Sequence, residues 1–109
     1  MYIPQRADVV WLQFNPQAGH EQAGRRPGLV ISPIVYNQKV GLALFCPITS
    51  RMKGYPFEVV LPEKFPIQGV ILSDQVKSLD WQARQAEWIG SVPKSIIEEV
   101  LLKIQILLS

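Results

Sequence analysis

Residues 7–14, ADVVWLQF, are mostly β-branched and aromatic, and the turn residues Asn15 and Pro16 follow them directly. This composition predicts a first β-strand that ends in a turn. Similar short apolar runs recur along the chain, and most of them end at Pro or at a polar residue. They occupy residues 29–32, 41–47, 57–61, 70–73 and 86–92. Frequent turns between short strands are typical of small antiparallel sheets.

The last segment of the chain changes from strand to helix periodicity. Its apolar residues recur at spacings of three and four, as on one face of a helix: Ile97, Val100, Leu101, Ile104, Leu107 and Leu108. The pattern predicts a helix from Pro93 to Leu108. Further apolar residues widen this face beyond one stripe, so we expect one side to cover the sheet and the excess to meet another subunit.

These elements predict a mainly β fold with a C-terminal helix (α+β), built as a small antiparallel β-barrel with the helix packed on it. A chain of 109 residues forms one domain, residues 1–109. Two polar stretches interrupt the strands. Residues 15–28 are predicted to form a long loop without regular structure, and residues 36–39 a turn.

Composition excludes several classes of protein. Apolar residues make up 48% of the chain, which argues against disorder. The apolar runs are shorter than the ~20 residues of a membrane span, and the N-terminus has no apolar signal core. Cys46 is the only cysteine and sits in an apolar run, so we expect it in the core of a protein kept in the reducing cytoplasm. No Cys/His cluster suggests a metal or cofactor site.

Charge is distributed unevenly. Residues 1–53 carry six Lys/Arg and two acidic residues, a net of +4, whereas residues 54–109 carry five and seven, a net of −2. A local positive field is expected for a protein that binds a polyanion. A solvated surface would give the same counts, so charge alone does not decide between them.

Groups able to move protons or hold phosphate gather within residues 20–28. His20, Glu21, Arg25 and Arg26 lie there among two glycines and a proline. Cleavage of a phosphodiester by a ribose 2′-OH needs a base, cations that stabilise the phosphorane, and an acid for the leaving oxygen. Forked guanidiniums suit the second role, and Thr49, at the end of a predicted strand, can add a hydroxyl. A histidine ordinarily titrates near ~6.5 and a glutamate near ~4.3, which leaves the base open between His20 and Glu21.

Each of these residues also has an ordinary explanation. The histidine can be a solvated loop residue, Glu21 can pair with Arg25, and Arg-Pro-Gly can be a simple turn. The residues alone therefore leave both a nuclease and a plain binding module open.

Several motifs occur in the same order as in a known toxin family. The blocks are DVVW with FNP, GHEQAGRRP, SP with YN, PIT, KGYPFEV and DQVKS, which together run from Asp8 to Ser78, and the amphipathic C-terminal segment follows. The chain resembles the MazF/PemK (Kid) toxins over nearly its whole length, and the KGYPFEV block is most similar to the MazF branch.

The resemblance implies an SH3-like barrel, the plasmid maintenance toxin/cell growth inhibitor fold, in a homodimer. It also implies an mRNA interferase, the toxin of a type II toxin–antitoxin pair. Such enzymes are sequence-specific endoribonucleases that need neither ribosome nor metal. They cut single-stranded RNA to a 2′,3′-cyclic phosphate and a 5′-hydroxyl, and a labile antitoxin blocks their RNA groove.

Residue roles are implied by position. Arg26, Thr49 and Glu21 match the catalytic residues of the family. His20 and Asp74 match a loop histidine and an aspartate of the PemK branch. That branch has an arginine two residues before the aspartate, where this chain has Leu72, so its Arg/Asp mechanism is not carried over whole. Residues expected to contact RNA are His20, Gln22, Arg25, Lys53, Asp74, Gln75 and Lys77.

An alternative function exists on the same fold. Related toxins bind and inhibit a DNA topoisomerase through the C-terminal helix and catalyse no reaction. The combination of Glu21, Arg26 and Thr49 favours the nuclease, because a pure binding protein has no use for it.

Overall fold

Short antiparallel strands and two helices make up the fold. The computed structural model describes residues 1–15, 19–21 and 24–109. In chain order its elements are β1 (Asp8–Gln13), β2 (Arg25–Val30), α1 (Ile34–Val40), β3 (Leu42–Thr49), β4 (Glu58–Val60), β5 (Val70–Leu72), β6 (Lys77–Asp80), β7 (Glu87–Ser91) and α2 (Lys94–Leu108). The predicted mainly β fold with a C-terminal helix is confirmed.

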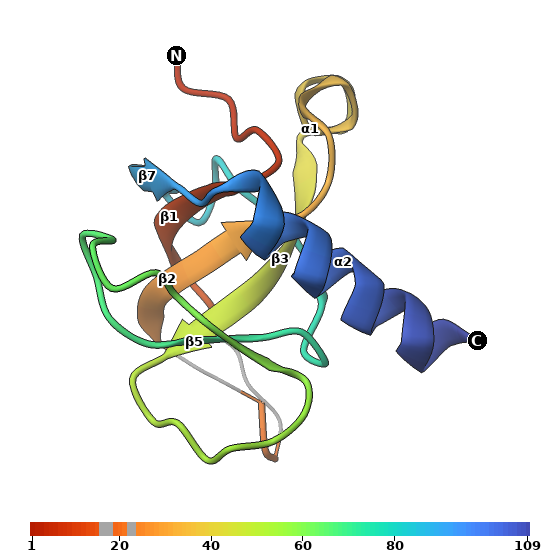
Figure 1. Cartoon of the computed structure of the whole chain (residues 1–109). Coiled ribbons are helices and arrows are strands. Elements are labelled where there is room, and N and C mark those ends of the chain that lie inside the picture. Colours follow the sequence, from red (N-terminus) through yellow and green to blue (C-terminus); the bar gives the residue numbers. More distant parts are fainter. Residues whose placement is uncertain (16–18, 22–23) are drawn as a thin grey trace.

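One strand, β3, connects the two parts of a curved seven-stranded sheet (Figure 1). The strand order is β4-β5-β3-β2-β1-β7, and β6 also pairs with β3. The first half of β3 pairs with β6, whereas its last residues, Ile48 and Thr49, pair with β5. Within the described residues no pairing joins the edge strands β4 and β7, so the sheet forms an open, SH3-like barrel. The change of partner along β3 puts Thr49 opposite Val70, the first residue of β5.

Alternate residues of the central strands face two separate apolar clusters. Val9, Leu29 and Cys46 belong to the first cluster, which also receives the buried face of α2. The second cluster contains Val10 and Phe45. The predicted apolar excess of the helix is present in part, since Leu102 and Ile106 are exposed and Ile96 is half-buried. Leu107 and Leu108, which were predicted on the face that covers the sheet, are exposed instead. None of the helices in the described part of the chain is both long and apolar enough to cross a membrane.

The structure corrects two of the predicted polar stretches. Residues 36–39 are not a turn but part of α1, which is anchored by the buried Asn37. Its side chain donates to the carbonyls of Pro4 at 2.7 Å and Ser32 at 3.1 Å. Residues 15–28 are not a loop throughout, because β2 begins at Arg25, which lies opposite Gln13 of β1. Pairing with β1 keeps this part of the chain extended, although Pro27 and Gly28 are residues typical of turns.

Candidate functional site

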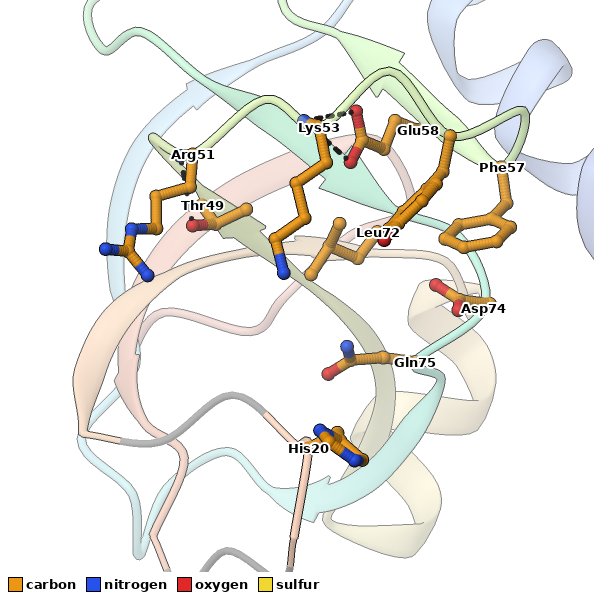
Figure 2. Close-up of a pocket in the computed structure, with 10 residues that line it drawn as sticks. His20, Thr49, Arg51, Lys53, Phe57, Glu58, Leu72, Asp74 and Gln75 are labelled. Carbon is orange, nitrogen blue, oxygen red and sulfur yellow. Dashed lines mark hydrogen bonds between the residues drawn. The ribbon is translucent and has the colours of Figure 1, made fainter.

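A cavity of about 310 Å³, here called the Thr49 cavity, lies where the ends of β3 and β5 meet the segment between β3 and β4 (Figure 2). It brings together five of the predicted site residues, from parts of the sequence more than fifty positions apart. Its lining residues are His20, Thr49, Arg51, Lys53, Tyr55, Phe57, Glu58, Leu72, Asp74 and Gln75.

Thr49 is the last residue of β3 and is held firmly in place. Its side chain is buried, and Oγ1 accepts a hydrogen bond from the backbone N–H of Arg51 at 3.2 Å. A hydroxyl that accepts one bond still has its own proton to donate. Gly69 presses against the Thr49 backbone: a Cβ on Gly69, whose φ is +143°, would lie 2.6 Å from the Thr49 carbonyl oxygen. The hydroxyl is therefore fixed by the strand, the following loop and a glycine contact.

Arg26 lies on β2, the neighbour of β3. The two strands pair antiparallel with Gly28 opposite Pro47. Arg26 is two residues before Gly28, and Thr49 is two residues after Pro47. Because side chains alternate along strands, this register puts Arg26 and Thr49 on the same face of the sheet. The half-buried Arg26 also borders a second cavity, of about 300 Å³, together with Trp11, Arg25, Pro27, Ile48, Ser50, Ile67 and Gln68.

The charged residues of the first predicted loop have partners on distant strands. Glu21 pairs with Lys77 of β6 at 3.0 Å, and Arg25 pairs with Glu87 of β7 at 2.5 Å. The alternative in which Glu21 pairs with Arg25 is therefore replaced by two ion pairs that each bind the segment to the sheet. The predicted contact residue Gln22 lies outside the described residues.

Residues 50–57, here called the 50–57 segment, supply site residues that the sequence did not single out. Arg51, Tyr55 and Phe57 line the cavity, and the two rings lie 5.4 Å apart. Aromatic side chains beside cations are a typical surface for unstacked nucleobases. The sequence therefore contained a signal for this wall of the cavity, aromatic residues next to basic ones, although only Lys53 was predicted to contact RNA. Glu58 and Leu72, from the adjoining strands, complete this wall.

Burial shifts the pKa of several titratable groups, among them Asp74 and Cys46. Burial of the carboxyl raises the pKa of Asp74; a backbone hydrogen bond partly opposes this, and the negative charge of Glu58 adds to it. Asp74 therefore loses its proton at a higher pH than an ordinary aspartate does. Burial also raises the pKa of Cys46 to about 12, as expected for an unreactive thiol in the core.

Together these groups can bind and polarise a phosphodiester. In the described part of the chain, the side chains of Arg51 and Lys53 form no ion pair, so their charges are available to a ligand. They lie beside the hydroxyl of Thr49 in a partly enclosed space, where donors act more strongly than in water. Among the described residues no three His, Cys, Asp or Glu side chains gather in a way that could hold a metal ion.

Comparison with known proteins gives consistent relatives. Residues 5–108 match the family model for the PemK-like, MazF-like toxin of type II toxin–antitoxin systems. The endoribonuclease toxin MazF of Escherichia coli K12 is 46% identical over 107 residues, which cover 98% of this chain and 96% of that protein. The endoribonuclease toxin ChpB of the same organism is 38% identical and covers 93% and 90% of the two chains.

Solved structures of MazF proteins have the same fold as this chain. MazF of Deinococcus radiodurans superposes with a TM-score of 0.96 at 52% identity, covering 99% of this chain and 98% of that one. A MazE–MazF structure from the same organism superposes with a TM-score of 0.89 at 45% identity, covering 100% and 98%. With the family match across almost its full length, the chain belongs to the PemK-like, MazF-like toxins of type II toxin–antitoxin systems.

Proposed function

We propose that this toxin is a sequence-specific endoribonuclease that cuts single-stranded RNA without metal or ribosome, and that Arg26 and Thr49 act on the scissile phosphate. What carries the proposal is the register of β2 and β3, from which we infer that Arg26 and Thr49 share one face of the sheet, together with the cavity that Thr49, Arg51 and Lys53 line. Relatives that are named endoribonucleases support the same activity and favour it over inhibition of a topoisomerase.

The proposed reaction is an internal transfer. The ribose 2′-oxygen attacks phosphorus and gives its proton to a base, while the P–O5′ bond breaks and the 5′-oxygen takes up a proton. The products are a 2′,3′-cyclic phosphate and a 5′-hydroxyl. Arg26 and the Thr49 hydroxyl stabilise the charge that develops on the phosphorane oxygens. One well-placed donor of this kind contributes about 3 kcal/mol to transition-state stabilisation.

Two residues compete for the role of base. His20 lines the Thr49 cavity, whereas Glu21 does not line it and its carboxylate pairs with Lys77. Glu21 is favoured as the base because it matches the position of a catalytic glutamate in the MazF/PemK toxins. We expect Glu21→Ala to slow single-turnover cleavage more than it weakens RNA binding. Equal losses in both would make Glu21 a positioning residue and leave His20→Ala, with its pH–rate profile, as the test of the base.

Three partners belong to the proposal. Single-stranded RNA exposes base edges that can be read by Lys53, Gln75, Lys77 and Gln22. A second copy of the chain is expected to cover part of the exposed apolar surface of α2. A cognate antitoxin is expected from the family and from the similar structures that contain MazE together with MazF.

The proposed activity is tested with a mixed-sequence RNA in excess EDTA, followed by mass spectrometry of the fragment ends. We expect cyclic phosphate and 5′-hydroxyl termini with the wild-type chain, and cleavage slowed about 10²–10³-fold with Arg26→Ala. RNA that stays intact with the pure, folded wild-type protein contradicts the proposal, and so does equal cleavage by the variant.

A further inference from the structure

A lysine of the C-terminal helix reaches the 50–57 segment from behind. The Lys103 ammonium donates to the backbone carbonyl of Pro56 and, at 3.4 Å, to that of Glu58. It also pairs with Glu99, one turn earlier in α2, at 3.5 Å. An ammonium has three donors, and these three partners can engage all of them. Lys103 thus connects α2 to the strand that begins at Glu58.

The Glu58 side chain continues this connection into the segment itself. Its carboxylate accepts the backbone N–H of Lys53 at 3.2 Å (Figure 2). It also accepts the backbone N–H of Gly54 at 3.0 Å. The backbone N–H of Glu58 donates to the carbonyl of Tyr55 at 3.1 Å. One residue therefore holds three positions of the 50–57 segment, and Lys103 holds that residue. We call this arrangement the Lys103–Glu58 clasp.

The clasp acts on backbone groups and leaves the cavity-facing side chains to a ligand. Lys53, Tyr55 and Phe57 all line the Thr49 cavity, and each lies within two residues of a group that the clasp binds. A loop whose bound shape is already formed loses less conformational entropy when it takes up a ligand. Lys103 itself does not line the cavity.

We propose that Lys103 and Glu58 are positioning residues that preorganise the 50–57 segment for RNA. The proposal rests on the proposed function, and it assigns to α2 a role in substrate binding besides covering the sheet. Loss of the clasp weakens binding of ground state and transition state alike. It therefore raises KM and leaves kcat nearly unchanged.

The test compares Lys103→Met with Glu99→Gln. Methionine keeps the apolar stem and the helix propensity of lysine but removes its donors. Glu99→Gln removes the ion pair within α2 and keeps the two carbonyl contacts. We expect KM for RNA to rise about tenfold in Lys103→Met with kcat within about twofold of wild type, and both constants to stay near wild type in Glu99→Gln. Lys103→Arg, which restores donors, should recover most of the loss.

A second readout needs no RNA. Trypsin cuts after Arg51 and Lys53, so the rate of cleavage at these sites, identified by mass spectrometry, reports opening of the segment. Both Lys103→Met and Glu58→Gln should be cut faster than wild type. Glu58→Gln keeps α2 intact, which preserves the test if the helix variant fails to fold.

The outcomes separate the two proposals. A wild-type chain that leaves RNA intact contradicts the proposed function. A wild-type chain that cuts RNA, together with an unchanged KM and unchanged trypsin cleavage in Lys103→Met, overturns the clasp. A loss of the same size in Glu99→Gln also overturns it, because the effect would then come from the charge of α2 and not from the carbonyl contacts.

Discussion

The two basic regions of this toxin use their charges in different ways. Around residues 19–26 two charged side chains are paired with distant strands, Glu21 with Lys77 and Arg25 with Glu87. In the 50–57 segment the acidic partner, Glu58, binds backbone N–H groups instead of side chains. Arg51 and Lys53 consequently have no ion pair within the described residues. A count of charges along the sequence does not distinguish these two situations.

The difference has a physical consequence for RNA binding. A cation already paired with a carboxylate must give up that partner to bind phosphate, although a partly exposed ion pair contributes only about 0–1 kcal/mol. An unpaired cation gains the full effect of phosphate contact and counterion release. The 50–57 segment is therefore the region whose cations bind RNA more favourably. The ion pairs around residues 19–26 are better suited to hold that segment against the strands that carry Lys77 and Glu87.

The largest expected effect separates two adjacent arginines. Arg26→Ala should lower kcat about 10²–10³-fold, because it removes a donor to the developing phosphorane charge. Arg25→Ala removes the same charge from a side chain that is bound to Glu87, so its kcat should stay within a few-fold of wild type. Single-turnover cleavage of one RNA by both variants measures the difference. Equal losses would mean that general charge, and not position, is what matters in this region.

A glycine outside both regions should have the next largest effect. In Gly69→Ala the new Cβ meets the Thr49 carbonyl at 2.6 Å, so the Thr49 backbone must shift. We expect a loss of about 1–3 kcal/mol in the free energy of unfolding together with reduced kcat. Gly41→Ala, at the C-terminal end of α1, is the matched control, since its φ is +78° but an added Cβ meets nothing within 4 Å. Urea unfolding measures the stability of both variants, and single-turnover assays measure their cleavage rates. Equal losses in the two variants would show that the contact between residue 69 and the Thr49 backbone is not the cause.

The salt dependence of RNA binding compares the two regions with a smaller effect. For single-stranded RNA the slope of log K against log salt is smaller by about 0.7 for each phosphate that the protein no longer neutralises. Arg51→Ala should reduce the slope by about that amount, and Arg25→Ala by much less. Fluorescence anisotropy with a non-cleavable RNA analogue measures both. A larger change for Arg25→Ala would reverse the assignment of the two regions.

The smallest expected effect concerns pH. Burial raises the pKa of Asp74 in the folded state, so ionisation of this carboxyl opposes folding as pH rises through its folded pKa. Asp74→Asn should therefore have a higher Tm than wild type at pH 7. The difference should vanish as pH falls below the ordinary aspartate value of ~3.9, where both side chains are neutral. A Tm difference that does not change with pH would point to packing instead.

The sequence predicted α2 and every strand except β6, because apolar periodicity reports burial directly. It missed β6, whose residues Lys77–Asp80 are mostly polar. It missed α1 because the helix depends on Asn37, whose side chain bonds to Pro4, 33 positions away. It extended the first loop too far because the pairing of Arg25 with Gln13 overrides local Pro and Gly signals.

The site was predicted in part, and for physical reasons. Reaction chemistry and the family resemblance pointed to Arg26, Thr49 and Glu21, residues whose side chains carry the reactive groups. Aromatic residues beside cations in the 50–57 segment were a local signal for the wall formed by Arg51, Tyr55 and Phe57. The support from Lys103 depends on which segments fold together, and neither spacing nor composition encodes that. The ion pairs that commit Arg25 and Lys77 also join residues more than fifty positions apart.

A double-mutant cycle on Arg26 and Thr49 tests whether these two residues form one catalytic unit. Single-turnover cleavage rates are measured for Arg26→Ala, Thr49→Ala and the double variant on the same RNA. If both side chains act on one phosphate, the double variant should be little slower than the slower single variant, as for residues that work together. Losses that multiply would show that the two residues act independently, and would contradict a shared site on the common face of β2 and β3.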